Sequence, residues 1–204
     1  MSEKTLDTEQ KIKEAARKIF HEKGFAATKT RDIAEEAGIN LALLNYYFRS
    51  KEKLYDIIML ETIQDFFGNI LLVLNDEKTS LHEKLELFVA KYIDYISKNI
   101  DIPLFILNEA RKNPEGFAQQ LDFEQKIKNS KFAQQFKREV KKGNVAKGNP
   151  LHILMNISSL IIFPFIASPL IKAVTKTKQA EFDQMMKERK KLIPIWIDAM
   201  FKVK

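Results

Sequence analysis

The stretch TRDIAEEAGINLALLNYYFRSKEKLY, residues 30–55, contains two short helical patterns separated by a turn. Gly38 follows the first pattern, where a helix often ends in the left-handed conformation that Gly adopts without steric cost. Asn40 is placed to cap a second helix over 41–48. The positions that face inward at helical spacing are apolar or aromatic: Ile33, Ala34, Ala37, Leu44, Tyr47 and Phe48.

A longer amphipathic pattern precedes this pair of helices. It has a candidate cap at Asp7 or Thr8 and ends at Gly24. Its inward face is formed by Ile12, Ala15, Ala16, Ile19 and Phe20. A long helix that braces two short helices, joined by a turn containing Gly, is typical of a helix-turn-helix, in which the second short helix enters the major groove of DNA. Residues 1–53 are therefore predicted to form a DNA-binding domain.

The composition of the whole chain favours an all-α fold. Only 6 Gly and 6 Pro occur among 204 residues, which is too few for the frequent turns of an all-β protein. After residue 53 the sequence has the pattern of long helices, ending in one over about 180–201 that contains Pro194. We expect residues 54–204 to form a larger, carboxy-terminal helical domain. The absence of Cys excludes disulfides and thiolate zinc sites and is consistent with a cytoplasmic protein.

The net charge of +7 is unevenly distributed. Through residue 53 there are eleven Lys and Arg against nine Asp and Glu, whereas residues 126–147 hold eight basic residues and one acidic residue. Such a run is typical of a solvated helix face and is not evidence for DNA binding. The apolar segment 151–171 is interrupted by polar residues and Pro, so it favours a buried helix at a subunit interface over a membrane span. The first ten residues lack the pattern of a secretory signal.

The amino-terminal pattern resembles that of the TetR family of transcription regulators. The matching positions are Gly24, Phe25, Thr28, Asp32-Ile33-Ala34, Ala37-Gly38, Asn40, Leu44, Tyr47-Phe48 and Lys51-Glu52-Lys53-Leu54. They cover about the first quarter of the chain. The chain departs from the family in one place, since Leu41-Ala42-Leu43 stands where many members have a Lys, Gly, Thr run.

The resemblance implies a homodimer whose two amino-terminal domains bind an inverted-repeat operator in double-stranded DNA. Carried over by position, the residues expected at phosphates are Thr28, Thr30, Tyr47 and Lys51. Those expected toward the bases are Arg31, Asn40, Leu41, Ala42, Asn45 and Tyr46. The resemblance also implies a small-molecule effector bound by the second domain, and it favours a repressor that the effector releases, with activation left open.

Two sets of residues in the second domain are candidates for ligand binding and dimerisation. Aromatic rings with a polar tip suit an apolar effector, which gives a candidate pocket of Phe66, Phe88, Tyr92, Tyr95, Phe105 and Met155. Apolar positions on the last two long helices give a candidate four-helix dimer interface of Leu154, Ile157, Ile161, Phe165, Ile193, Trp196, Ile197 and Met200.

The sequence shows no pattern of an enzyme. The three His are far apart, and neither a zinc-binding H-E-x-x-H nor a G-x-S-x-G, P-loop or G-x-G-x-x-G sequence is present. We therefore expect no catalytic residue, no metal and no cofactor. The competing hypothesis is a helical carrier or sensor of apolar ligands that does not bind DNA, for which the 15 Phe and 6 Met are the argument. The outward face of the helix over 41–48 distinguishes the two hypotheses.

Overall fold

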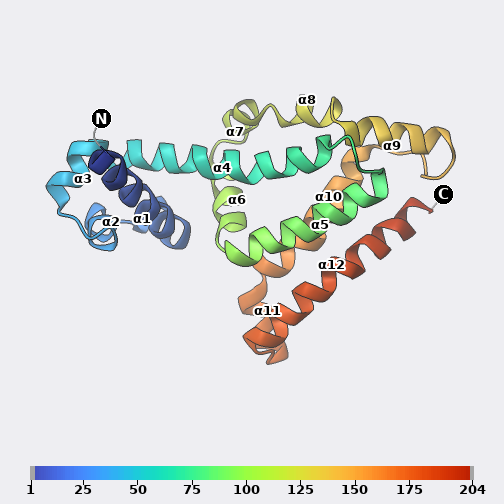
Figure 1. Cartoon of the computed structure of the whole chain (residues 1–204). Coiled ribbons are helices and arrows are strands. Elements are labelled where there is room, and N and C mark those ends of the chain that lie inside the picture. Colours follow the sequence, from blue (N-terminus) through green and yellow to red (C-terminus); the bar gives the residue numbers. More distant parts are fainter. Residues whose placement is uncertain (1–2, 203–204) are drawn as a thin grey trace. The chain divides into compact units, whose positions relative to one another are not determined.

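The structure is a computed structural model that describes residues 3–202, and every regular element within that range is a helix (Figure 1). The predicted all-α class is confirmed. The helices are α1 (Glu3–Ala27), α2 (Thr30–Glu36), α3 (Leu41–Phe48), α4 (Lys51–Asn75), α5 (Leu81–Lys98), α6 (Ile102–Lys112), α7 (Pro114–Leu121), α8 (Phe123–Lys128), α9 (Lys131–Lys141), α10 (Pro150–Ile166), α11 (Ser168–Thr175) and α12 (Gln179–Phe201).

The chain forms two compact units, Met1–Phe66 and Phe67–Lys204. The first unit holds α1 to α3 and the larger part of α4, and the second holds the end of α4 and all later helices. The sequence-based boundary lies after residue 53, near the start of α4. It would assign nearly all of α4 to the second domain, whereas the boundary between the two compact units lies after Phe66.

The first helix differs from its predicted bounds. Asp7 or Thr8 was expected to cap it, but α1 already begins at Glu3. Asp7 lies inside the helix and pairs with Lys11, one turn later, at 2.7 Å, an interaction that supports the additional turn. Gly24 has φ 72° and ψ 175°, so the regular helix is broken at the predicted position before the chain resumes helical geometry to Ala27.

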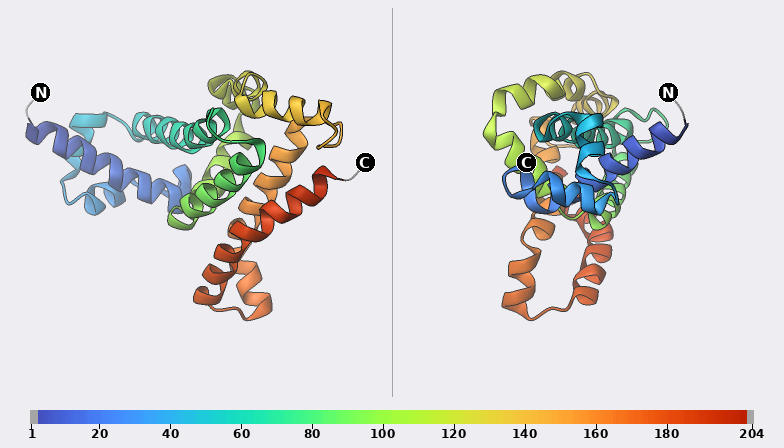
Figure 2. Two further views of the ribbon diagram at one scale, coloured as in Figure 1. Left: turned by 45° about the vertical axis from the view of Figure 1, so that its right-hand side comes forward. Right: turned by 90° about the vertical axis from the view of Figure 1, so that its left-hand side faces the viewer.

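In the second unit, α5 packs against α10 and α12 (Figure 2, left). The core at this contact is apolar, with Phe88 and Ile93 of α5 and Ile193 and Ile197 of α12 all buried. Pro194 lies inside α12, which continues through it to Phe201.

Two segments have the length and composition of a membrane-spanning helix. One is α4, and the other is α10 taken together with α11, which bends by 63° between them. This evidence for a membrane is weak, because core helices of soluble proteins share the same length and composition. Both α4 and α10 bury apolar side chains inside the protein, including Leu54 and Ile58 of α4 and Ile157 and Ile161 of α10.

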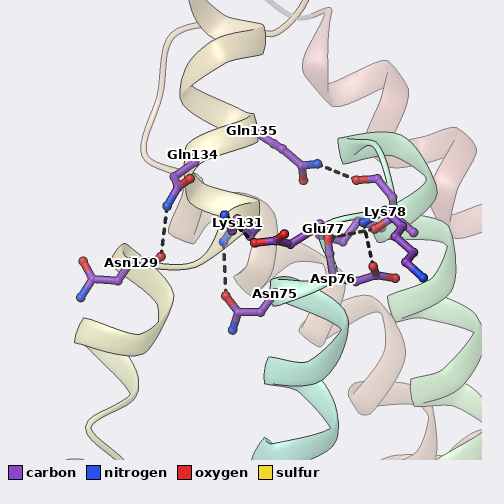
Figure 3. Close-up of polar contacts among 10 residues, drawn as sticks. Asn75, Asp76, Glu77, Lys78, Asn129, Lys131, Gln134 and Gln135 are labelled. Atoms are coloured by element: carbon purple, nitrogen blue, oxygen red, sulfur yellow. Dashed lines mark hydrogen bonds and ion pairs between the residues drawn. The ribbon is translucent and has the colours of Figure 1, made fainter.

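Polar contacts attach the start of α9 to the loop that follows α4 (Figure 3). The Lys131 backbone N–H donates to Asn75 Oδ1 at 3.3 Å, and its ammonium pairs with Glu77 at 2.7 Å. The side-chain amide of Gln135 donates to the carbonyl oxygen of Thr79 at 2.5 Å. These contacts hold α9 against the loop over 76–80.

Beneath this loop, a fully buried lysine donates hydrogen bonds to carbonyl groups at the carboxy-terminal end of α4. The Lys84 ammonium donates to the carbonyl oxygen of Val73 at 3.2 Å, to Thr79 Oγ1 at 2.8 Å, and to the carbonyl oxygen of Asp76. Burial lowers the pKa of Lys84 from its ordinary value, while the Asp76 carboxylate opposes that change. Because the last carbonyl groups of a helix have no partner within it, this ammonium takes the place of a backbone cap.

Candidate nucleic-acid interface and ligand cavity

The turn between α2 and α3 has the geometry of a Schellman motif. Gly38 has φ 66°, and its N–H donates to the carbonyl oxygen of Glu35 at 3.0 Å. The N–H of Ile39 donates to the carbonyl oxygen of Ala34 at 2.9 Å. This pair of hydrogen bonds ends α2 and sets the direction of the chain into α3, which confirms the predicted left-handed Gly38.

Asn40 begins α3 as its cap, as predicted. Its Oδ1 accepts a hydrogen bond from the Leu43 backbone N–H at 2.8 Å. The Asn40 side chain is exposed, but its oxygen is engaged in the cap. Only the amide NH₂ of Asn40 therefore remains available to a base or a phosphate.

The outward face of α3 carries the residues expected toward the bases. Ala42 and Asn45 are exposed, and the Tyr46 side chain is 77% exposed. Leu41 is half-buried at the start of the helix. Tyr46 meets the ring of Tyr47 edge-on, with their centroids 5.5 Å apart. An amide and a phenol thus protrude beside each other from the second helix of the motif.

The residues expected at phosphates do not share one environment. Thr28 is only 1% exposed, and its hydroxyl donates inward to the Gly24 carbonyl oxygen at 2.7 Å. This hydroxyl therefore closes the end of α1 and does not face outward. Thr30 and Tyr47 are half-buried, with Thr30 at the first position of α2, and Arg31 beside it is exposed.

The Lys51 side chain also points inward. Its ammonium donates to the carbonyl oxygens of Phe25 at 3.0 Å and Thr28 at 2.9 Å. It also lies 4.1 Å from the centre of the Phe25 ring. The resemblance implied a phosphate contact for Lys51, and a phosphate would also compensate a Lys charge that opposes the helix dipole. The structure shows another compensation for that charge, in two backbone carbonyl groups and an aromatic face.

Behind the helix-turn-helix, a histidine of α1 is half-buried against α4. His21 Nε2 lies 2.9 Å from Thr62 Oγ1. Burial and, to a smaller extent, the nearby Arg17 guanidinium together lower the pKa of His21 to about 4. His21 is therefore neutral at pH 7.

A cavity of about 420 Å³ lies in the second unit between the end of α4 and α5. Its lining includes three of the six aromatic and Met residues expected at an effector pocket: Phe88, Tyr92 and Tyr95. The remaining lining residues are Asn69, Ile70, Leu72, Val73, Lys91, Asp94, Lys98 and Asn99. The ring of Tyr92 stacks on that of Phe88, with centroids 5.2 Å apart.

The other three pocket candidates lie elsewhere. Phe66 is buried at the end of the first unit, and Phe105 is buried in α6 without lining the cavity. Met155 is 63% exposed on α10. The two lysines at the cavity were missed by sequence reasoning, although Lys91 and Lys98 are seven residues apart and flank the Tyr92 and Tyr95 stripe of α5.

The candidate dimer residues are divided by their burial. Six of the eight are packed inside the subunit: Leu154, Ile157, Ile161, Phe165, Ile193 and Ile197. These six side chains form the core between the helices and are not exposed to a partner, so this part of the prediction is corrected. Trp196 and Met200 remain exposed, and Arg189 lies 5.2 Å from the Trp196 ring centre.

Among residues 3–202, no three His, Asp or Glu side chains come together in a way that could hold a metal ion. His82 of α5 contacts two carboxylates, Asp198 at 3.0 Å from Nδ1 and Glu86 at 3.3 Å from Nε2. Both ring nitrogens are thus engaged by neighbouring carboxylates.

Comparison with known proteins shows that the amino-terminal region is similar to one family of regulators. Residues 12–57 match the family model described as "Bacterial regulatory proteins, tetR family". Over 201 residues the chain is 25% identical to the "Probable HTH-type transcriptional regulator YttP" of Bacillus subtilis, covering 97% of this chain and 95% of that protein. Over 50 residues it is 44% identical to the "HTH-type transcriptional repressor KstR2" of Rhodococcus jostii, covering 24% of each chain.

The fold also matches solved structures. The TetR family transcriptional regulator PfmR of Thermus thermophilus superposes with a TM-score of 0.61 at 19% identity. The match covers 90% of this chain and 97% of PfmR. The likeness includes the larger carboxy-terminal helical part as well as the helix-turn-helix.

Proposed function

From the match of residues 12–57 to the TetR family model, we propose that this chain is a TetR-family transcriptional regulator, and specifically a homodimeric repressor released from its operator by a small apolar effector. As a regulator of transcription it acts in the cytoplasm, where the DNA is. The repressor that it resembles over 50 residues, KstR2, supports repression over activation.

The observation that carries the proposal is the outward face of α3. Asn45 and Tyr46 are exposed there. An Asn amide can pair with the N6 and N7 atoms of adenine, and such a bidentate contact distinguishes adenine from other bases. A carrier of apolar ligands has no need for these groups on the exposed face of a helix-turn-helix.

Contacts to phosphate are assigned to the groups that remain at least partly exposed. Tyr47 and Thr30 retain this role, with Tyr47 packing its ring against Phe48 at 6.4 Å between centroids. Arg31, exposed in the first turn of α2, has the charge and length to reach either a phosphate or a base edge. Lys51 and the Thr28 hydroxyl serve the fold of the domain instead.

Dimerisation is proposed through the exposed apolar surface of α10 and α12. Leu192, Trp196 and Met200 follow one another on one face of α12 at helical spacing and are exposed. The amide of Asn156 on α10 contacts Met200 Sδ at 3.5 Å, and Phe163, seven residues later on the same face of α10, is 65% exposed. Two such surfaces related by a two-fold axis form a four-helix interface.

The effector is proposed to bind in the cavity between α4 and α5. A volume of about 420 Å³ is within the range of small-molecule sites. By linkage, an effector that weakens operator binding by some factor is itself bound more weakly by that factor when the operator is present.

Selection of bound sequences from a random DNA pool tests the proposal. The expected result is one enriched sequence with inverted half-sites, whose centres lie about one helical turn or slightly more apart. A gel shift with the selected DNA should then show a complex of two chains per site. Recovery of no enriched sequence, together with no gel shift on genomic fragments, would support the non-DNA-binding carrier instead.

A further inference from the structure

The cavity between α4 and α5 has two chemically different sides. The α4 side is mostly apolar, formed by Ile70, Leu72 and Val73, with Asn69 as its one polar residue. Leu72 borders the cavity and is 72% exposed. This side suits a hydrocarbon body.

The α5 side combines an aromatic floor with a charged edge. Phe88, Tyr92 and Tyr95 form a stripe along the helix, and Lys91 and Lys98 lie on one flank of it, two turns apart. The only acidic residue in the lining is Asp94.

The charge of Asp94 is already compensated from another helix. Its Oδ1 accepts a hydrogen bond from the ammonium of Lys190 on α12. Within residues 3–202, neither Lys91 nor Lys98 forms an ion pair with a carboxylate. The edge of the cavity therefore presents two positive charges without an anionic partner, while the acidic residue between them is paired with a third lysine.

We propose that the ligand of this cavity is an amphipathic anion, with an apolar chain or ring system against α4 and the aromatic stripe and one carboxylate at Lys91 and Lys98. A carboxylate adds charge-assisted hydrogen bonds to an apolar contact and gives orientation to a ligand that is otherwise held by non-directional forces. This proposal names the chemical class of the effector and so rests on the proposed function for its regulatory meaning, but binding itself is independent of DNA.

The test compares three probes of equal chain length, decanoate, 1-decanol and decylamine, by isothermal titration calorimetry on the full chain without DNA. We expect decanoate to bind about tenfold more tightly than decanol, and decylamine to bind most weakly. The preference for decanoate should shrink as NaCl is raised from 50 mM to about 500 mM, because salt screens exposed charges.

Two variants locate the charge effect. Lys91→Gln with Lys98→Gln should weaken decanoate about tenfold and leave decanol unchanged, as expected for two partly exposed pairs that each contribute about 0.7 kcal/mol. The matched control, Lys137→Gln with Lys187→Gln, removes the same net charge from exposed positions outside the cavity and should change neither affinity. Leu72→Trp, which places an indole at the exposed edge, should weaken decanoate and decanol alike.

Equal affinity for decanoate and decanol, tighter binding of decylamine, or no binding of any probe would overturn the proposal. An equal effect of the two double variants would also overturn it, since the charge effect would then be non-local. Release of operator DNA is measured separately. If decanoate binds as expected but leaves the operator complex intact, the ligand class stands and the proposed ligand-responsive repression fails.

Discussion

The Lys51 ammonium donates to the Phe25 carbonyl oxygen at 3.0 Å and lies 4.1 Å from the centre of the ring of the same residue. A single cation at the first position of α4 thereby closes the end of α1. Together with the Thr28 carbonyl oxygen, which it also contacts at 2.9 Å, it links the long first helix to the turn that leads into the helix-turn-helix. We therefore propose that Lys51 supports DNA binding through the fold of the domain.

Replacing Lys51 should destabilise the protein and leave the salt dependence of DNA binding unchanged. Lys51→Met keeps most of the aliphatic stem but removes the donor for two carbonyl groups, so the free energy of unfolding should fall by about 1.5–3 kcal/mol. Urea unfolding followed by circular dichroism measures this change. Lys53→Met, at an exposed neighbouring position, is the control and should have little effect.

The salt dependence separates this role from a phosphate contact. A lost phosphate contact lowers the slope of log affinity against log salt by about one. If Lys51→Met lowers the slope in this way without changing stability, the ammonium leaves its carbonyl partners in the DNA complex and the sequence-based assignment holds.

Asn45→Ala should reduce specific binding alone. The side chain is exposed on α3, so its loss leaves the fold intact. We expect a cost of about 1–3 kcal/mol per half-site on the selected operator, almost no change on random DNA, and a relaxed preference at one base pair in each half-site. Competition gel shifts with both DNAs measure the two affinities. A proportional loss on both would show that α3 is not the helix that contacts the bases.

The helix-turn-helix was largely predictable because the residues that end and cap its helices act locally. Gly38 and Asn40 each act on the few residues beside them, and both have their predicted roles in the structure. The partner of Lys51 was not predictable, since its acceptors lie more than twenty residues away in sequence and depend on how α1 ends. A positive charge near a DNA-binding helix has the same sequence signature whether it faces inward or outward.

The sequence predicted that the last helices exist, but it did not predict which side of each helix is buried in the subunit. Apolar residues surround α10 on several sides, including the buried Ile157 and the exposed Met155 and Phe163. Hydrophobicity alone cannot assign one side to the core and the other to a partner when both are apolar. The six residues chosen for the interface therefore turned out to be the core of the subunit, and only their exposed neighbours remain candidates.

Acid should destabilise the first unit through His21. The pKa of His21 is about 4 in the folded protein and near 6.5 when it is unfolded. Between these values the unfolded chain binds a proton that the folded chain does not, so stability falls as the pH is lowered from about 6.5 toward 4. The shift corresponds to about 3 kcal/mol at most.

His21→Gln retains a polar partner for Thr62 but removes this titration. Urea unfolding of both proteins at several pH values from 7 to 4 should therefore show a flatter pH dependence for the variant than for the wild type. The same change at His152, which is exposed, is the control and should leave the pH dependence unchanged. Parallel curves for wild type and His21→Gln would mean that His21 becomes protonated without a cost to the fold.

Charges placed on the exposed face of α12 should dissociate the dimer while each subunit stays folded. Leu192 and Met200 are 40% and 36% exposed within one subunit, so Leu192→Glu with Met200→Glu buries no charge in the monomer. In a dimer formed through this face, four carboxylates would be removed from water without partners, at a cost of several kcal/mol. Sedimentation should then give the 23.7 kDa monomer in place of a particle of about twice that mass.

Leu104→Glu with Leu107→Glu, on the exposed face of α6, introduces the same charge elsewhere and should leave the dimer intact. If the α12 variant remains dimeric while the α6 variant becomes monomeric, the subunits associate through α6 and the face assigned to α12 is wrong.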